Sequence, residues 1–459
     1  MFQTTCFMDT AEPDIAMADK KAPPMRRVDW LHFVRTLHLE LFLFVYAVSY
    51  SMRLVMTQDL LLTKACWQRH AINASSCRNL SWNVTIKDDV TRYANMHNLA
   101  LFLIQFVPAG LLSIFVSPWS DRYGHKIPLL VATSGGIPAG PDHSLHRNVH
   151  QCSTVLPLSS VQFLMASVLG LFVGGQVFRA AGGNYTAIYV TSAVLLAVMF
   201  VWIGWTVPFS SQLHRTSRRE LVRDLMRLDN LREGGRAVFR QRPGYNRAKL
   251  LLLMISIWFI LFNSETARNI NYFYTETRFD WSPVKFSNVT AFFGLVQLLA
   301  TAVCVVVLSR LLQVRDLVLA CLGVVAFALQ NALKGISTHE WMYYLSYVLG
   351  APGGAAGIGI SSYASKLISP HEATKVFSFW TTCESLVPAF GDIFSSLVFN
   401  AALSYQPGLP FLIGAALQLF PLAALILCLR MPHADPEDED EAMIETERDS
   451  SINQLPHSL

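Results

Sequence analysis

The chain has 459 residues, of which 52% are hydrophobic and only 15% charged, and its mean hydropathy is +0.36. Soluble domains carry roughly 25% charged residues, so this composition excludes a soluble globular protein. It also excludes an intrinsically disordered chain, a collagen and a disulfide-dense secreted scaffold. At roughly 20 apolar residues for each bilayer crossing, the length allows about ten to twelve membrane-spanning helices.

Ten apolar segments are long enough, or nearly so, to cross a bilayer as helices. Helix is the expected form because an unpaired backbone is too costly in lipid. A membrane barrel would instead give short segments of alternating polarity. The predicted spans cover residues 38–60, 99–117, 160–178, 185–207, 250–274, 287–308, 312–333, 341–364, 374–400 and 409–430. The sequence therefore predicts an all-α polytopic membrane protein.

The basic residues of the loops indicate the orientation of these spans. Residues 208–249 hold ten Arg and one Lys against four acidic residues. Basic pairs also occur in the loops on the same side of the predicted membrane. These pairs are Arg122 with Lys126, Arg310 with Arg315, and Lys366 with Lys375. Since cytosolic loops are enriched in Lys and Arg, this side is predicted to be cytosolic.

The loop 61–97 lies on the opposite side and has features of a lumenal or extracellular segment. It holds three N-x-S/T glycosylation sequons, at Asn73, Asn79 and Asn83. Cys66 and Cys77 lie in the same loop and are predicted to form a disulfide there. The even number of spans then puts both chain termini in the cytosol.

The spans and loops divide the chain into five regions. These are a cytosolic N-terminal tail (1–36), an N-terminal helical bundle (37–207), a basic cytosolic linker (208–249), a C-terminal six-helix bundle (250–430) and an acidic cytosolic tail (431–459). The first bundle is predicted to be incomplete. Its residues 127–159 are rich in Pro, Gly and His and contain no 18-residue apolar run, so they form an atypical insert.

A motif follows the second span: Ser117-Pro-Trp-Ser-Asp-Arg-Tyr-Gly-His-Lys126. It resembles the major facilitator superfamily signature G-x-x-x-D-[RK]-x-G-[RH]-[RK], with Ser117 in place of the first glycine. The resemblance implies a two-bundle transporter fold of twelve spans with a cytosolic gate. The gate residues would be Asp121, Arg122, Gly124, His125 and Lys126. A degenerate copy of the motif ends at Asp316 in the second half.

Within that superfamily the chain resembles solute carrier family 46, the group of the proton-coupled folate transporter. The resemblance rests on Glu40, the stretch 361–378 and the stretch 410–416. It covers the first two spans and then about 160–430, so the family's third and fourth spans are missing. The family's functional fifth-span Glu falls at Met165 and its seventh-span His at Asn263. The resemblance therefore implies proton-coupled transport but not folate as the solute.

Ionisable residues inside spans indicate functional positions, since isolated they cost at least ~2.5–3.5 kcal/mol. In the first span, Arg53 is placed either to bind an anionic substrate or to snorkel toward the membrane surface. In the fifth span, four polar residues lie on one helix face: Glu265, Arg268, Asn269 and Tyr272. Glu265 and Arg268 can pair at i,i+3, either as a permanent structural pair or as a switch in which protonation of Glu265 frees Arg268.

The ninth span adds two further carboxylates, Glu384 and Asp392. Asp392 shares a helix face with Ser385, seven residues earlier, and is predicted either to bind a proton or to serve helix packing. In the eighth span, the glycine-rich segment 350–359 is predicted to serve close packing through two pairs, Gly350/Gly354 and Gly353/Gly357, with a kink at Pro352.

These observations predict a secondary transporter that moves a small organic solute, anionic if Arg53 binds it, by alternating access with proton coupling. The alternative is a truncated, transport-dead membrane protein that acts as a partner or sensor. No metal cluster, catalytic triad or phosphate-binding loop is present in the sequence, so no enzyme activity, organic cofactor or nucleic-acid partner is expected. The expected location is the plasma membrane or the lysosomal membrane.

Overall fold

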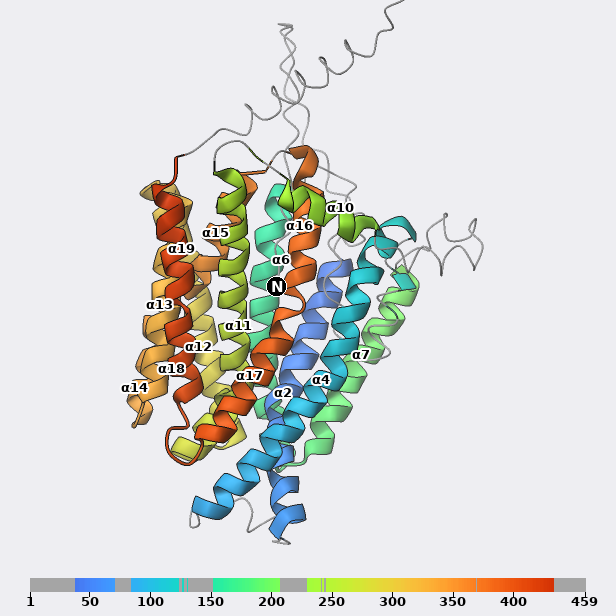
Figure 1. The fold of residues 1–459 in the computed structure, drawn as a ribbon. Coiled ribbons are helices and arrows are strands. Elements are labelled where there is room, and N and C mark those ends of the chain that lie inside the picture. The colour runs from blue at the N-terminus through green and yellow to red at the C-terminus, as the bar shows by residue number, and fades with distance from the viewer. Residues whose placement is uncertain are drawn as a thin grey trace, which may run out of the picture.

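The computed structural model describes residues 38–70, 84–123, 126–127, 130, 152–206, 229–240, 242, 245–368 and 370–432. Within these ranges every regular element is a helix and none is a strand, and the long helices run side by side (Figure 1). Eight of the described helical stretches are long and apolar enough to cross a membrane. The predicted all-α polytopic fold is confirmed.

Four helices form the N-terminal half: α2 (His38–His70), α4 (Val84–Tyr123), α6 (Cys152–Ala180) and α7 (Tyr185–Thr206). Each contains one of the first four predicted spans. Both α2 and α4 extend well beyond the apolar runs, into the loop predicted between them. The helix α6 begins inside the stretch predicted as an insert, and residues 128–129 and 131–151 of that stretch lie outside the described residues.

The C-terminal half begins with a short helix in the basic linker, followed by the remaining elements. They are α10 (Asp229–Phe239), α11 (Asn246–Phe279), α12 (Pro283–Val305), η3 (Val306–Leu311), α13 (Asp316–Ile336), α14 (Glu340–Leu349), η4 (Ala351–Gly354), α15 (Ala355–Ser365), α16 (Pro370–Glu384), α17 (Val387–Ala402), α18 (Leu409–Leu417) and α19 (Leu419–Arg430). Most of the predicted tails and linker, 1–37, 207–228 and 433–459, lie outside the described residues.

Local signals fix several helix ends. The α12 helix starts after Ser282, whose hydroxyl accepts a hydrogen bond from the backbone N–H of Lys285, with Pro283 in the first turn. The long helix α11 ends at Phe279, and the next residue, Asp280, has φ 52° and so turns the chain out of the helix. Between α16 and α17 the chain makes a turn at residues 385–386, just before Pro388.

The eighth predicted span is not one continuous helix. It is interrupted by η4, a 3-10 segment that contains Pro352, so the predicted kink is confirmed. A Cβ on Gly350 would meet Gln330, one on Gly353 would meet Phe327 and one on Gly354 would meet Thr301, all under 3 Å. The packing role predicted for these three glycines is confirmed. It is wrong for Gly357, which has open space where a Cβ would lie.

A close backbone contact in this region joins α13 to α15. A Cβ on Gly323 would lie 2.3 Å from the backbone nitrogen of Ala356. We expect Gly323→Ala to lower the thermal midpoint of the detergent-purified protein, because backbone cannot yield as a flexible side chain does and overpacking costs about 1–3 kcal/mol. The matched control, Gly357→Ala, should melt no lower than the wild type. Equal midpoints for the two variants would contradict the close α13–α15 contact.

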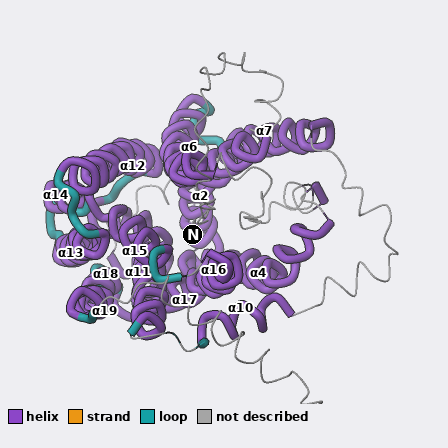
Figure 2. Tube along the Cα trace, turned by 90° about the horizontal axis from the view of Figure 1, so that it is seen from above, coloured by secondary structure: helices purple, strands orange, loops and turns teal. Residues whose placement is uncertain are grey.

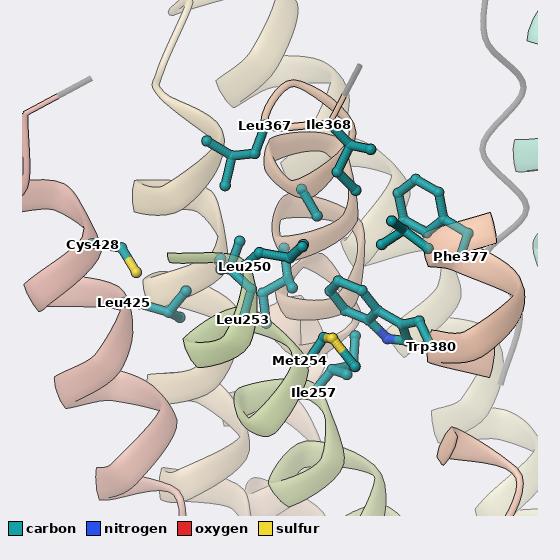
Figure 3. Packing of buried hydrophobic residues seen from close by; sticks show 14 of the residues in the cluster. Leu250, Leu253, Met254, Ile257, Leu367, Ile368, Phe377, Trp380, Leu425 and Cys428 are labelled. Atoms are coloured by element: carbon teal, nitrogen blue, oxygen red, sulfur yellow. The ribbon is translucent and has the colours of Figure 1, made fainter. Parts of the chain in front are cut away.

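One buried cluster lies at the end of the molecule that carries the linker helix α10, whose Ala237 and Val238 belong to it. Figure 3 shows part of this cluster. It packs Leu253 and Met254 of α11 against Trp380 of α16 and Leu425 of α19. All of its fully buried members belong to the C-terminal half. At this end, therefore, the C-terminal half has its own core, without residues of α2, α4, α6 or α7.

A second cluster lies at the opposite end, where α2 ends and α4 begins, and it joins the two halves. We call this end the 71–83 end, after the residue numbers between the two helices. It combines Val55 and Leu62 of α2 and Val90 of α4 with Tyr272 of α11 and Phe399 of α17. The same halves meet where α6 packs against α12 and α4 against α17 (Figure 2). The described core thus closes the two halves onto each other at the 71–83 end.

Candidate functional site

The middle of α11 carries an ion pair within the apolar part of the fold. Arg268 and Glu265 contact each other one helical turn apart, as the i,i+3 spacing predicts. The Glu265 side chain is 1% exposed, whereas that of Arg268 is 30% exposed. The guanidinium also interacts electrostatically with Asp392 and with Tyr50 of α2. Arg268 therefore lies between the two halves and remains accessible there.

The second carboxylate of this cluster comes from α17. The Asn269 side-chain amide of α11 donates a hydrogen bond to Asp392 Oδ1. Asp392 is fully buried, and its second oxygen, Oδ2, makes no hydrogen bond in the described part of the chain. The Thr266 hydroxyl also donates to the carbonyl of Gly391, 3.3 Å away. These contacts place the Asp392 carboxylate beside the ion pair.

Unsatisfied buried polar atoms gather around this cluster. They are Arg268 Nε and Asp392 Oδ2, together with Glu265 Oε2, which contacts Arg268 but has no hydrogen-bond partner. Most buried polar atoms in folded proteins are hydrogen-bonded, and each one left unmade costs about 1–3 kcal/mol. A cluster of such atoms can accept a proton, water or a polar ligand. We therefore take Glu265, Arg268, Asn269 and Asp392 as the candidate site.

The first span contributes Arg53 from the other half of the molecule. Arg53 Nε donates to the carbonyl oxygen of Ser49, 3.2 Å away in the same helix, and no carboxylate pairs with it among the described residues. Arg53 also interacts electrostatically with Tyr46. Tyr50, three residues before Arg53, is within electrostatic range of Arg268. The polar face of α2 and the polar face of α11 therefore meet.

Tyr272 lies one helical turn beyond this cluster and has a different partner. Its hydroxyl donates to Oδ1 of Asp59, 2.6 Å away, across the boundary between the halves. Asp59 was not among the predicted site residues. The signal that could have found it is plain, because Asp59 is an ionisable residue within the predicted span 38–60.

Glu384 lies apart from the candidate site. It is buried at the end of α16 and accepts a hydrogen bond from the Trp380 indole. The predicted helix that would carry both Ser385 and Asp392 is interrupted, because α16 ends at Glu384 and α17 begins at Val387, so Ser385 lies in the turn between them. The Ser385 hydroxyl instead bonds the carbonyl of Thr382.

Only part of the predicted cytosolic gate is described. Asp121 and Arg122 belong to the last turn of α4, so this part of the motif is helical, while Gly124 and His125 lie outside the described residues. The Lys126 ammonium donates to the carbonyl of Gly204 at the end of α7, 2.9 Å away. In the degenerate copy, Asp316 accepts hydrogen bonds from Ser362 and Lys366, which ties α13 to the end of α15.

The predicted lumenal loop is also described in part. Cys66 is disulfide-bonded, while the predicted partner Cys77 lies outside the described residues. The three sequon residues Asn73, Asn79 and Asn83 lie outside them as well.

Polar contacts between the halves reinforce closure at the 71–83 end. The Lys87 ammonium of α4 forms ion pairs with Glu276 and Asp280 at the end of α11. Asn95 of α4 donates to Asn400 of α17 at 2.8 Å, and Gln176 of α6 donates to Asn288 of α12 at 2.9 Å. None of these inter-half contacts was predicted from the sequence.

Comparison with known proteins identifies the class of this membrane protein. The family model of the Major Facilitator Superfamily matches residues 155–441, which is more than half of the chain. The chain belongs to the major facilitator superfamily. It is therefore an integral multi-pass membrane protein of a family of secondary transporters, and the family points away from an enzyme.

One curated relative and two solved structures illustrate the similarity. The Escherichia coli class C tetracycline resistance protein is 27% identical over 150 residues, which are 33% of this chain and 37% of that protein. The human organic anion transporter MFSD10 superposes with TM-score 0.53 at 15% identity, covering 86% of this chain and 99% of that one. An auto-inhibited POT family peptide transporter gives TM-score 0.52 at 12% identity, covering 88% and 98%. At these identities the two structures show a shared fold.

Proposed function

We propose that this protein is a proton-coupled secondary transporter of small organic anions, similar to solute carrier family 46, that works by alternating access. The observation that carries the proposal is the cluster of Glu265, Arg268, Asn269 and Asp392 between the two halves. A buried acid–base pair beside a second buried carboxylate supplies both a cation for the solute and carboxylates for protons.

Solute transport is coupled to protons because the anionic solute and Glu265 compete for one cation, the Arg268 guanidinium. While Glu265 is ionised, it neutralises Arg268 and the arginine has little attraction left for an anion. When Glu265 takes up a proton, Arg268 regains its unpaired charge and pairs with the solute carboxylate instead. Asp392, in electrostatic range of Arg268, is the second group that can carry the proton.

The anionic class of the solute is supported by two arginines from opposite halves. Arg53 of α2 and Arg268 of α11 approach the tyrosines Tyr46 and Tyr50 of α2. Arginine presents donors in a planar fork that fits a carboxylate. The human neighbour of similar fold is named as an organic anion transporter, which agrees with this class.

The orientation of the proposed cycle comes from the basic loops. With the linker 208–249 in the cytosol, the 71–83 end faces the lumen or the exterior, and the described state is closed there. The cycle then requires the inter-half contacts of Lys87, Asn95 and Tyr272 to separate so that the site opens outward. This assignment places both chain termini in the cytosol of a plasma-membrane or lysosomal protein.

The proposal is tested by uptake into proteoliposomes. The purified chain is reconstituted, and a panel of radiolabelled monocarboxylates, dicarboxylates and folates is offered with and without an inward-directed proton gradient. We expect saturable uptake of at least one anion, enhanced by the gradient and abolished in Arg268→Met. Specific uptake of none of them, by a protein that remains folded in the vesicles, would favour the transport-dead alternative.

The loop 71–83 is expected to be glycosylated and held by the Cys66 disulfide. The reason is the three sequons beside the two cysteines and the observed disulfide of Cys66. Digestion of membrane-expressed protein with an N-glycosidase should increase its gel mobility, and non-reducing peptide mapping should join Cys66 to Cys77. Three unmodified asparagines would overturn the assignment of this loop to the lumenal side, and Cys66 joined to another cysteine would refute the predicted pair.

A further inference from the structure

The carboxylate of Asp59 joins three helices from both halves of the molecule. Its Oδ2 accepts a hydrogen bond from Tyr185 of α7, 2.7 Å away, within the N-terminal half. Its Oδ1 accepts one from Tyr272 of α11, 2.6 Å away, in the C-terminal half. One oxygen therefore binds within a half and the other crosses between the halves, next to the shared core at the 71–83 end.

Titratable groups surround this carboxylate on several packed helices. Tyr185 and Tyr189 come from α7, Lys87 from α4, and Tyr272 and Glu276 from α11, with Glu276 in electrostatic range of Asp59. Lys87 forms ion pairs with Glu276 and Asp280, and Lys285 of α12 forms one with Glu340. Arg179 lies exposed at the end of α6.

The strength of the Tyr272 contact depends on the ionisation of Asp59. Hydrogen bonds to an ionised carboxylate are roughly twice as strong as those between neutral groups. A protonated carboxyl keeps its carbonyl oxygen as an acceptor and gains one O–H donor, so the hydrogen bonds from the two tyrosine hydroxyls lose their charge assistance. Ionised Asp59 thus favours contact between the halves, and protonation weakens it.

We propose that Asp59 is a proton-coupling residue that controls the 71–83 end: ionised, it holds the two halves together through Tyr272, and when protonated it releases Tyr272 so that this end opens. The effect of this opening on solute transport rests on the proposed function, whereas the contact between Asp59 and Tyr272 closes the 71–83 end without any solute. Arrival of a proton from the 71–83 side would then prepare the protein for outward access to the Arg268 site.

Distance measurements across the 71–83 end test this proposal. Spin labels are attached through ketone-bearing amino acids at Lys64 and Tyr405, two exposed positions in the two halves, so that the cysteines stay untouched. Double electron–electron resonance is recorded on the full chain in nanodiscs at neutral and at acidic pH. In the wild type we expect a short distance at neutral pH, and acid should raise the population of a long distance by roughly tenfold.

Four variants separate Asp59 from its surroundings. Tyr272→Phe should populate the long distance at neutral pH, and Asp59→Asn should do so equally at both pH values. Tyr185→Phe is the matched control, since it removes the other hydroxyl from the same carboxylate without touching the contact between halves, and it should stay closed at neutral pH. Lys87→Met should shift the populations yet retain the response to acid.

Three results would overturn the proposal. The first is that Asp59→Asn and Tyr272→Phe both keep the wild-type distances and the wild-type response to acid. The second is that Tyr185→Phe opens as far as Tyr272→Phe. The third is that Lys87→Met abolishes the response to acid while Asp59→Asn retains it. Failure of the proposed function is a separate outcome. A protein that opens in acid but transports no anion would support the role of Asp59 in opening and would refute anion transport.

Discussion

Glu265→Ala is expected to remove most of the folded protein, because it leaves the Arg268 charge without its closest partner inside the fold. Glu265 is 1% exposed and contacts Arg268 directly. Breaking a buried ion pair by removing one partner costs about 3–5 kcal/mol, a large share of the stability of a typical domain. The measurement is the yield and thermal midpoint of protein purified in detergent.

The control for this prediction is Ser264→Ala, at an exposed position beside Glu265 on α11, which should behave as wild type. The double variant Glu265→Ala with Arg268→Met should recover much of the lost stability, because no unpaired charge remains. A single Glu265→Ala variant as stable as wild type would mean that water or another group already compensates Arg268.

Asp392→Asn is expected to keep the fold but uncouple uptake from the proton gradient. The substitution preserves the size of the side chain and mimics its protonated form, while Asp392 Oδ2 has no hydrogen bond to lose in the described part of the chain. A single coupled proton allows up to about tenfold accumulation of solute per pH unit. The variant should still exchange solute across the membrane but show no accumulation.

The control for uncoupling is Glu384→Gln, whose carboxylate contacts Trp380 away from the ion pair. It should retain gradient-driven uptake in the same vesicles. If Glu384→Gln uncouples and Asp392→Asn does not, the proton pathway runs through α16, and the candidate site is misplaced. Glu265→Gln belongs in the same experiment, since either carboxylate of the cluster can carry the proton.

Much of this architecture could be predicted from the sequence because bilayer thickness sets the length of apolar runs. Each of the ten predicted spans lies largely on described helices. The extensions of α2 to His70 and of α4 from Val84 could not be predicted, since charged and polar residues interrupt their apolar residues and no bilayer constraint applies to them. The turn at residues 385–386 was missed because the span 374–400 was predicted from its length and its overall composition, which do not reveal a two-residue interruption.

The part of the candidate site that depends on spacing along a single helix could be predicted from the sequence. The pairing of Glu265 with Arg268 follows from i,i+3 geometry, whereas contacts between halves depend on tertiary packing that no local pattern encodes. Thus Asn269 was predicted, but its hydrogen bond to Asp392 was not. Lys334, buried at 4.1 Å from the ring centre of Tyr347, was not predicted as a feature at all, because an isolated lysine near a helix end usually reaches water.

Proton movement measured together with solute uptake tests directly whether the cluster of Glu265, Arg268, Asn269 and Asp392 couples an anion to protons. Proteoliposomes loaded with a pH-sensitive dye receive an anion that the wild type transports, without an imposed gradient. We expect the interior of the vesicles to acidify as the anion enters through the wild-type protein. Asp392→Asn or Glu265→Gln should abolish this acidification while anion exchange continues. Anion uptake by the wild type with no change in the pH inside the vesicles would contradict proton coupling at this cluster.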